Sequence, residues 1–427
     1  MSPLRIAGLV AAAMSISSSA HAAWETKQLA GMSVEVYTPA GMSPIGSGRA
    51  LMIALHGCAQ TGSQLQQYGN FESAAEDFGM VVALPTVPGG GVIAGCWNYY
   101  GATHTRTSGH NKPIIELAQS LRDDAGYGVD PAQIYLVGFS SGGGQALIVG
   151  CLAPEIFAGV GVSAGPSLGT SVSQIAQVGT NVGQTVTLCQ QYAGANAASF
   201  DTQLAITFTD SNDFTVAQGY AQINAEMYAT IYGGGTLLGS APFDVASLPG
   251  TNPAGSALAY DDAEGERVAS ISSMGVGHNW PSGSGTAGPP TSYVAGTGLN
   301  LSYFAAETFT ANARRADGEW NPGGEDSGSD GGSDAGSGSE GGESGSEAGE
   351  AGGGSNDDAA GTDGGSTGGG AGGEGGSGIS TATAGADGGY VPPSGCQCSS
   401  IGDTQGAAVP WFAAACVALR LRRRRAV

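Results

Sequence analysis

Short apolar runs alternate with amphipathic segments along most of the chain. The runs are continuous, which is typical of strands that are buried on both faces of a sheet. The segments between them repeat apolar residues at helical spacing. This alternation predicts an α/β fold, with a mostly parallel sheet and helices on both of its faces. The predicted strands are residues 50–55, 80–84, 133–137, 157–162 and 203–208, and the predicted helices are residues 64–78, 113–125, 143–149, 217–228 and 299–314.

Two other segments alternate apolar and polar residues, which indicates strands with one solvated face. Residues 32–37 are predicted to form an edge strand, and residues 266–271 a strand nearer the edge. Active sites of parallel sheets lie at the carboxyl ends of their strands. The residues that directly follow the predicted strands are therefore the candidates for chemistry.

One predicted strand leads into Gly138-Phe139-Ser140-Ser141-Gly142, and a predicted helix follows. Strand, sharp turn and helix around a Gly-x-Ser-x-Gly pattern are typical of a nucleophile elbow. The turn holds the serine at a strained backbone angle, and the small flanking residues let the helix approach the strand closely. The alternative is a glycine-rich turn with an incidental serine, because the bare pattern recurs by chance.

A serine nucleophile needs a base within hydrogen-bond reach and an acid that orients the base. His278 follows the strand at residues 266–271 in a glycine-rich loop and is the predicted base. Asp213, which follows the strand at residues 203–208, is our first choice for the acid, and Asp210 is the second. The order Ser, Asp, His is that of α/β-hydrolases. The alternatives are a surface-loop histidine and an aspartate that only caps the next helix.

The oxyanion that develops during acyl transfer needs backbone donors aimed at it. We expect one donor to be the amide of Ser141, directly after the nucleophile. The other is expected in the turn after residues 50–55, at Cys58. A disulfide from Cys58 to Cys96 would hold that turn rigid, or would only staple a surface loop.

The 427 residues include 76 glycines and carry a formal net charge of −22, and both are concentrated near the C-terminus. Residues 317–387 are almost only Gly, Ser, Ala, Asp and Glu, a composition that cannot offset its ordering entropy by burying apolar surface. This acidity argues against nucleic acid as a partner. The predicted organisation is a signal peptide at residues 1–22, a catalytic domain at 23–315, a disordered acidic linker at 316–393 and a sorting or anchor segment at 394–427.

The first 22 residues combine a basic residue, an apolar stretch and Ala20-His21-Ala22, which is the pattern of a cleaved secretory signal. Secretion places the seven cysteines in an oxidising compartment, where pairing is expected. No His/Cys spacing resembles a zinc site, so no metal is expected. Four cysteines of the catalytic domain allow three pairings, of which we prefer Cys58 with Cys96 and Cys151 with Cys189.

Six motifs follow one another along residues 24–315: Leu55-His56-Gly57-Cys58, Cys96-Trp97-Asn98, Asp130-Pro131, Gly138-Phe139-Ser140-Ser141-Gly142-Gly143, Asp213-Phe214-Thr215-Val216 and Gly277-His278-Asn279-Trp280-Pro281. Together they resemble the secreted poly(3-hydroxybutyrate) depolymerase family of serine esterases. The resemblance implies an α/β-hydrolase fold, ester hydrolysis through an acyl-enzyme and no cofactor. It places the nucleophile on Ser140, the acid on Asp213, the base on His278 and an oxyanion donor on Cys58.

The substrate is the least specified part of this reading. The resemblance implies short-chain polyhydroxyalkanoate, poly(3-hydroxybutyrate), or its oligomers. The same domain also resembles feruloyl and acetylxylan esterases, which makes esters of plant polysaccharide the alternative, and a non-catalytic binding protein on a hydrolase scaffold is a third. The residues expected to line the cleft, unless they only pack under a long loop, are Trp97, Asn98, Tyr99 and Trp280.

The chain departs from that family in two places. Phe139 and Ser141 stand where the family often has Leu and Ala, and neither side chain does the chemistry. The family also commonly adds a polymer-binding domain after a linker. Here a cysteine motif, the short apolar stretch 407–419 and an arginine cluster resemble the MYXO-CTERM type of sorting tail. This implies export machinery as a partner and attachment to the cell surface, whereas a plain membrane anchor or a free secreted protein are the alternatives.

Overall fold

Ten strands form one central sheet in the computed structural model of the protein, which describes residues 22–318. The order across the sheet is β1-β2-β4-β3-β5-β6-β7-β11-β10-β8. The six strands from β4 to β11 run parallel, β2 is antiparallel to β4, and antiparallel pairs extend both edges. The central strands are almost fully buried because their apolar runs are covered on both sides.

The strands of this sheet are β1 (Ala23–Leu29), β2 (Met32–Thr38), β3 (Arg49–Leu55), β4 (Met80–Pro85), β5 (Val129–Phe139), β6 (Gly159–Ser163), β7 (Leu204–Asp210), β8 (Gly239–Phe243), β10 (Gly255–Asp262) and β11 (Gly265–Ser273). Two short pairs are formed by β9 (Gly250–Thr251) with β14 (Gly298–Leu299), and by β12 (Trp280–Pro281) with β13 (Val294–Ala295). The α-helices are α1 (Gly62–Tyr68), α2 (Glu72–Asp77), α3 (Asn111–Asp123), α4 (Ser141–Leu152), α5 (Val182–Ala193), α6 (Gly219–Tyr232) and α7 (Leu301–Ala311). The 3-10 helices are η1 (Pro88–Gly90), η2 (Val172–Gln174), η3 (Gly194–Thr202), η4 (Val245–Ser247) and η5 (Pro290–Ser292).

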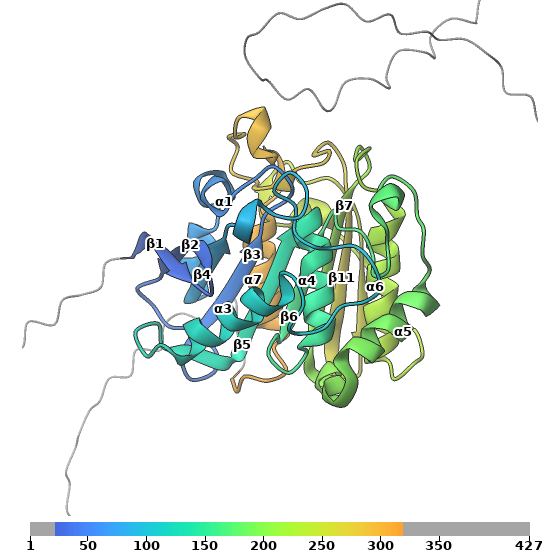
Figure 1. Ribbon diagram of the computed structural model, residues 1–427, viewed down its shortest axis with the longest axis horizontal. Helices are drawn as coiled ribbons and strands as arrows, with labels where there is room; N and C mark the ends of the chain where they lie inside the picture. Colours follow the sequence, from blue (N-terminus) through green and yellow to red (C-terminus); the bar gives the residue numbers. More distant parts are fainter. Residues whose placement is uncertain (1–21, 319–427) are drawn as a thin grey trace, which may run out of the picture. The chain divides into compact units, whose positions relative to one another are not determined.

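Helices cover both faces of the sheet, as the sequence predicts. Figure 1 shows α4 and α6 in front of the sheet and α7 behind it. Helices α3, α4, α5 and α6 pack on one face, and α1, α2 and α7 on the other. Each face has its own apolar core, so the sheet separates two clusters of buried side chains.

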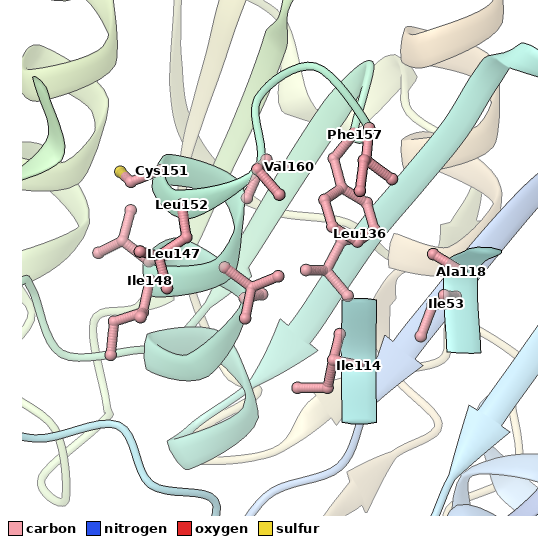
Figure 2. Close-up of a cluster of buried hydrophobic side chains, with 14 of the residues drawn as sticks. Ile53, Ile114, Ala118, Leu136, Leu147, Ile148, Cys151, Leu152, Phe157 and Val160 are labelled. Atoms are coloured by element: carbon pink, nitrogen blue, oxygen red, sulfur yellow. The ribbon is translucent and has the colours of Figure 1, made fainter. Parts of the chain in front are cut away.

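Every residue of helix α4 is buried. Leu147 and Ile148 lie in the core that also contains Leu136 of β5 and Val160 of β6 (Figure 2). A helix that is apolar all round can only be stable in such a position. The elbow that precedes α4 is therefore fixed between the strands and a well-packed core.

This topology, with an antiparallel second strand and a Gly-x-Ser-x-Gly turn between β5 and α4, is the predicted α/β-hydrolase fold. Two details of the prediction are wrong. The helix expected at residues 64–78 is split into α1 and α2 at Gly69 and Asn70, where Asn70 has a φ of 58°. Strand β2 is not an edge strand, because β1 pairs outside it. Strand β11 lies nearer the edge than the central strands, as predicted, with only β10 and β8 outside it.

Other predictions concern segments beyond the described residues. The C-terminal sorting segment, nearly all of the linker and all but the last residue of the signal peptide lie outside residues 22–318. Between residues 22 and 318, no helix has both the length and the apolar character that a membrane span requires.

Candidate active site

Ser140 stands at the tip of the turn between β5 and α4, with φ 54° and ψ −119°. Such a conformation is strained for any residue with a Cβ and persists only where the surroundings enforce it. The Ser140 amide donates a 2.8 Å hydrogen bond to the carbonyl oxygen of Ser163 at the end of β6. The flanking glycines are required for close approach, because a Cβ on Gly138 would lie 2.2 Å from the carbonyl oxygen of Gly142.

Ser140, His278 and Asp213 meet at the carboxyl edge of the sheet although they lie far apart in the sequence. The distance from His278 Nε2 to Ser140 Oγ is 3.0 Å, and His278 Nδ1 lies 2.8 Å from Asp213 Oδ2. The elements that bring them there are β5, β7 and β11, whose loops all leave the same edge. In this geometry His278 Nε2 can accept the Ser140 hydroxyl proton, and the Asp213 carboxylate can hold the imidazole ring through Nδ1–H.

The Asp213 carboxylate is buried and immobilised by its own loop. Its Oδ1 accepts backbone hydrogen bonds from Thr215 and Val216, at 2.8 and 3.0 Å. Oδ2 is thereby left to face His278. Of the two candidate acids, Asp213 therefore contacts the histidine.

Asp210, the second candidate for the acid, does not contact His278. Its side chain is 1% exposed and accepts hydrogen bonds from Asn212, Ser273 and Val276. Both aspartates follow the same strand within a few residues, and Asp213, the first choice from the sequence, is the one that faces His278.

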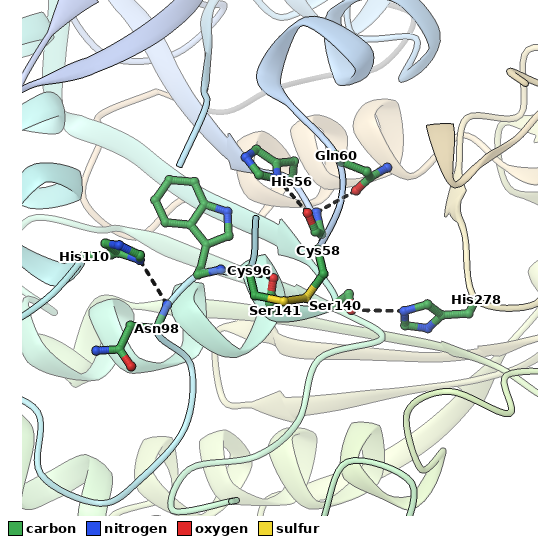
Figure 3. Close-up of a disulfide and its surroundings, with 11 residues drawn as sticks. His56, Cys58, Gln60, Cys96, Asn98, His110, Ser140, Ser141 and His278 are labelled. Atoms are coloured by element: carbon green, nitrogen blue, oxygen red, sulfur yellow. Dashed lines mark hydrogen bonds between the residues drawn. A yellow bond between two sulfur atoms is a disulfide. The ribbon is translucent and has the colours of Figure 1, made fainter. Parts of the chain in front are cut away.

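The turn after β3 brings Cys58 beside Ser140 and Ser141 (Figure 3). The Gly57 amide is occupied, because it donates to Gln60 Oε1 at 2.6 Å. The Cys58 amide has no hydrogen-bond partner among residues 22–318. Ser141 is the first residue of α4, where amides have no partner inside the helix. Both amides are thus available as donors at the edge of the site.

His56 fixes this turn through hydrogen bonds of its buried imidazole. Its Nδ1–H donates to the Gly57 carbonyl oxygen at 2.7 Å, and Nε2 accepts from the Val87 amide at 3.0 Å. Burial lowers the pKa of the His56 imidazole to about 4, so the ring is neutral and its tautomer is fixed by these two partners. It is a structural histidine, not a second base.

Among the cysteines of residues 22–318 there are two disulfides, and they join the pairs preferred from the sequence, Cys58 with Cys96 and Cys151 with Cys189. The first ties the turn after β3 to the loop between β4 and α3 (Figure 3). The next residue of that loop, Trp97, donates its backbone N–H to Ser141 Oγ at 3.3 Å. Disulfide and hydrogen bond together anchor the loop to both sides of the elbow.

A cavity of about 170 Å³ opens beside Ser140 and His278. Its wall is mainly apolar and includes Cys58, Ser141 and the side chains of Tyr99, Phe139, Pro166, Ile175, Val216 and Tyr293. Burial raises the pKa of Tyr99 to about 12, so its phenol is protonated. Of the four residues expected to line the cleft, only Tyr99 does so.

The other three residues expected in the cleft lie elsewhere. Trp97 is fully buried, with its ring between His56 and His110 at centroid distances of 5.4 and 5.6 Å. Trp280 is also fully buried, stacks on Phe71 and points its indole N–H to the Gly69 carbonyl. Asn98 is half-buried and is not part of the cavity wall. Aromatic residues next to catalytic motifs were a poor guide because packing under the loop explains them equally well.

The sequence did not indicate Ile175, which reaches the cavity from the segment between β6 and α5. That segment is held by Tyr220 of α6, whose hydroxyl lies 2.7 Å from the carbonyl oxygens of Gln174 and Gln177. The same hydroxyl accepts from the Gly179 amide at 3.0 Å. Nothing in the local pattern points to this anchor, because it depends on a helix more than forty residues away.

Within residues 22–318, no group of three or more His, Cys, Asp or Glu side chains is arranged to hold a metal ion. His104 and His110, the other described histidines apart from His56 and His278, are largely buried outside the cavity wall. Burial lowers the pKa of both. They belong to the packing of the loop that precedes α3.

Comparison with known proteins finds similar sequences and one matching family model. Residues 32–222 match the family model described as "Esterase PHB depolymerase". The chain is 37% identical over 290 residues to the poly(3-hydroxybutyrate) depolymerase of Ralstonia pickettii, an alignment that covers 66% of this chain and 58% of that protein. It is 29% identical over 149 residues to acetylxylan esterase A of Aspergillus ficuum, covering 35% and 47%.

Among solved structures, an acetyl xylan esterase from Aspergillus awamori matches with 19% sequence identity and a TM-score of 0.46, covering 60% of this chain and 94% of that one. The chain spans less than two thirds of the length of the two curated relatives, 58% and 47%.

Proposed function

We propose that the protein is a serine esterase that hydrolyses short-chain polyhydroxyalkanoate, poly(3-hydroxybutyrate), or its oligomers. The proposal is supported by the match of residues 32–222 to the family model described as "Esterase PHB depolymerase" and by the similarity to the depolymerase of Ralstonia pickettii. The observation that carries the proposal is the hydrogen-bonded line from Ser140 Oγ through His278 to Asp213. That line supplies a nucleophile, a base and an orienting acid in one geometry.

In the proposed acylation step, Ser140 Oγ attacks the ester carbonyl while its proton passes to His278 Nε2. The negative charge moves to the carbonyl oxygen, where the amides of Cys58 and Ser141 stabilise it. Asp213 stabilises the imidazolium through Nδ1–H. His278 then gives its proton to the leaving alcohol oxygen, and the C–O bond breaks to leave an acyl-serine.

Deacylation repeats the sequence with water as the nucleophile. His278 Nε2 takes a proton from water, the hydroxide oxygen adds to the acyl carbon, and the same two amides hold the oxyanion. Collapse of this intermediate releases the acid and returns the proton to Ser140. The net reaction consumes one water per ester bond and needs no further reactant.

The cavity supports a small acyl unit. Its volume of about 170 Å³ is below the roughly 300 Å³ at which pockets for drug-sized ligands begin. Tyr99, Ile175 and Tyr293 line it with mainly apolar surface. A four-carbon hydroxyacyl unit suits such a space better than the bulky aromatic acyl group of a ferulate ester.

The test measures acid release by the full chain from 3-hydroxybutyrate oligomers, amorphous poly(3-hydroxybutyrate), acetylated xylan and methyl ferulate. Ser140→Ala removes the nucleophile, and Ser120→Ala changes an exposed serine on α3 as the matched control. We expect hydroxybutyrate release by the parent and Ser120→Ala proteins and none by Ser140→Ala. Equal rates for the parent and Ser140→Ala on every ester would refute the catalytic proposal.

The second candidate is an esterase that removes acetyl groups from plant polysaccharide. It is favoured by the match to acetylxylan esterase A, and the small cavity also suits an acetyl group. Release of acetate from acetylated xylan without release of hydroxybutyrate would select it. Release of ferulate alone would contradict the argument from cavity size.

We also propose that the protein is secreted and displayed at the cell surface. The two disulfides support an oxidising compartment. The resemblance of residues 394–427 to a sorting tail supports attachment, with the acidic linker as a spacer. Protease treatment of intact cells that produce the full chain should release the catalytic domain, and its appearance only in the cell interior would oppose the proposal.

A further inference from the structure

Asp210 ends β7 with a carboxylate that is almost completely buried and faces no cation within residues 22–318. A buried carboxylate without a counter-ion must be compensated by hydrogen-bond donors. Here the donors come from two different loops. One of these loops carries Asp213, and the other carries His278.

The acid loop binds to Asp210 from one side. Asp210 Oδ1 accepts the Asn212 amide at 2.9 Å, and the Asp210 carbonyl oxygen accepts the Asp213 amide at 2.9 Å. These two bonds fold residues 210–213 into a tight turn. The turn fixes where the Asp213 side chain begins.

The base loop binds to the second oxygen of the same carboxylate. Asp210 Oδ2 accepts the Ser273 hydroxyl at 2.6 Å and the Val276 amide at 2.9 Å. Ser273 is the last residue of β11 and the register partner of Asp210, while Val276 lies two residues before His278. The Val276 amide is held in the stretch where the chain leaves the sheet to form the base loop.

We propose that Asp210 is the positioning residue that sets the Asp213–His278 distance, by clamping the acid loop and the base loop to one buried carboxylate. The proposal rests on the proposed esterase function, because it explains how that site keeps its geometry. Asp210 does not touch the reacting atoms, and its action runs through the two loops.

An asparagine at this position cannot satisfy the same donors. The three donors need both carboxylate oxygens, and an amide offers only one oxygen. If its NH₂ group takes the place of Oδ2, it faces the Val276 N–H, which cannot turn to accept a hydrogen bond. If its NH₂ group takes the place of Oδ1, the acid loop loses the Asn212 bond instead.

Asp130 provides a matched control at the amino-terminal ends of the parallel strands, opposite the candidate site. Its buried carboxylate also accepts three hydrogen bonds, from the amides of Ser47 and Ala132 and from Gln133 Nε2. It lies near the start of β5, whereas Ser140 directly follows the end of that strand, about 30 Å away by strand rise. Asp130→Asn therefore damages a similar network without touching either catalytic loop.

The experiment compares Asp210→Asn, Asp210→Glu and Asp130→Asn in the full chain, with p-nitrophenyl acetate as substrate and thermal melting as the measure of folding. We expect kcat of a folded Asp210 variant to fall at least about 30-fold with KM within threefold, because a misplacement of about 1 Å costs on the order of 100-fold. Asp130→Asn should keep kcat within about threefold. The glutamate variant retains the charge and two acceptor oxygens, so it provides a folded test if the asparagine variant does not melt cooperatively.

A second readout is the strongly deshielded proton NMR signal of His278 Nδ1–H in its bond to Asp213. We expect this signal in the parent and in Asp130→Asn, and its loss or broadening in the Asp210 variants. A folded Asp210 variant with kcat within threefold of Asp130→Asn and the signal unchanged would overturn the proposal. Inactivity of the parent on every ester would instead refute the esterase function, and the NMR comparison would still decide the role of Asp210.

Discussion

The two disulfides form an internal control for the role of the loop beside the elbow. Cys58–Cys96 and Cys151–Cys189 each close a loop with a sequence separation of 38 residues. The chain-entropy model assigns each of them the same stabilisation, about 4 kcal/mol. Their effects on stability should therefore be similar, and their effects on activity should differ.

Only the first disulfide borders the site. Cys58 lines the cavity and carries a proposed oxyanion donor, whereas Cys151 and Cys189 are buried in the core between α4 and α5. Releasing Cys58 frees the turn after β3 to move relative to Ser141. Because an oxyanion donor is worth about 100- to 1000-fold in kcat, partial misplacement of the turn should cost roughly 10- to 100-fold.

The assay compares Cys58→Ala/Cys96→Ala with Cys151→Ala/Cys189→Ala. Melting temperatures should fall by roughly 10 °C in both double variants, since 1 kcal/mol shifts a domain of this size by about 2–4 °C. At a temperature where both are folded, kcat should fall 10- to 100-fold only in the first variant. Equal loss of kcat in both variants would refute the reasoning, because it would make activity follow stability and not the position of the disulfide.

Two further predictions concern buried residues near the elbow. A Cβ on Gly142 would lie 2.4 Å from the Leu55 carbonyl oxygen, whereas the nearest atom to a Cβ on Gly183, also the second residue of its helix, is 3.5 Å away. Gly142→Ala should therefore lower kcat/KM by roughly 100-fold. The control Gly183→Ala should leave kcat/KM unchanged and raise the free energy of unfolding by up to about 1 kcal/mol. Parent-like activity of Gly142→Ala would contradict the argument from close packing. Burial lowers the pKa of His56 from 6.5 to about 4, so below pH 6.5 the unfolded chain binds a proton that the folded state resists. The contribution of His56 to the free energy of unfolding should be full above pH 6.5 and decrease towards pH 4 by up to about 3 kcal/mol. His56→Gln should make the midpoint of urea unfolding less dependent on pH over that range. An unchanged pH dependence of the midpoint in this variant would count against the role of the neutral, buried His56.

The fold was predictable because each central strand corresponds to a continuous apolar run in the sequence. Strands β3, β4, β5, β6 and β7 are buried on both faces and were all expected. The edges were not, because β8 is largely exposed and contains Pro242, and β1 is mainly polar. Such strands are defined by pairing with a neighbour and not by burial, so their own pattern carries little signal.

The placement of the candidate triad was predictable for a related reason. Ser140, Asp213 and His278 each follow a strand of the parallel sheet, so topology alone brings them to one edge. The cavity wall was not predictable, since Ile175 and Tyr293 come from irregular segments. Tyr293 has a φ of 49°, a backbone conformation that its residue type does not indicate.

The residues that hold the site are more deeply buried than the base they serve. His56 and Asp210 are 0% and 1% exposed, whereas the His278 side chain is 14% exposed. Each of the two closes hydrogen bonds between segments that are distant in sequence, and neither can move without leaving a buried polar group unpaired. The reactive groups can then sit on loops at the mouth of the cavity and still keep fixed distances. It follows that variants of His56 and Asp210 should lower kcat and change KM little. Such variants displace the oxyanion donors and the base but leave the cavity wall in place.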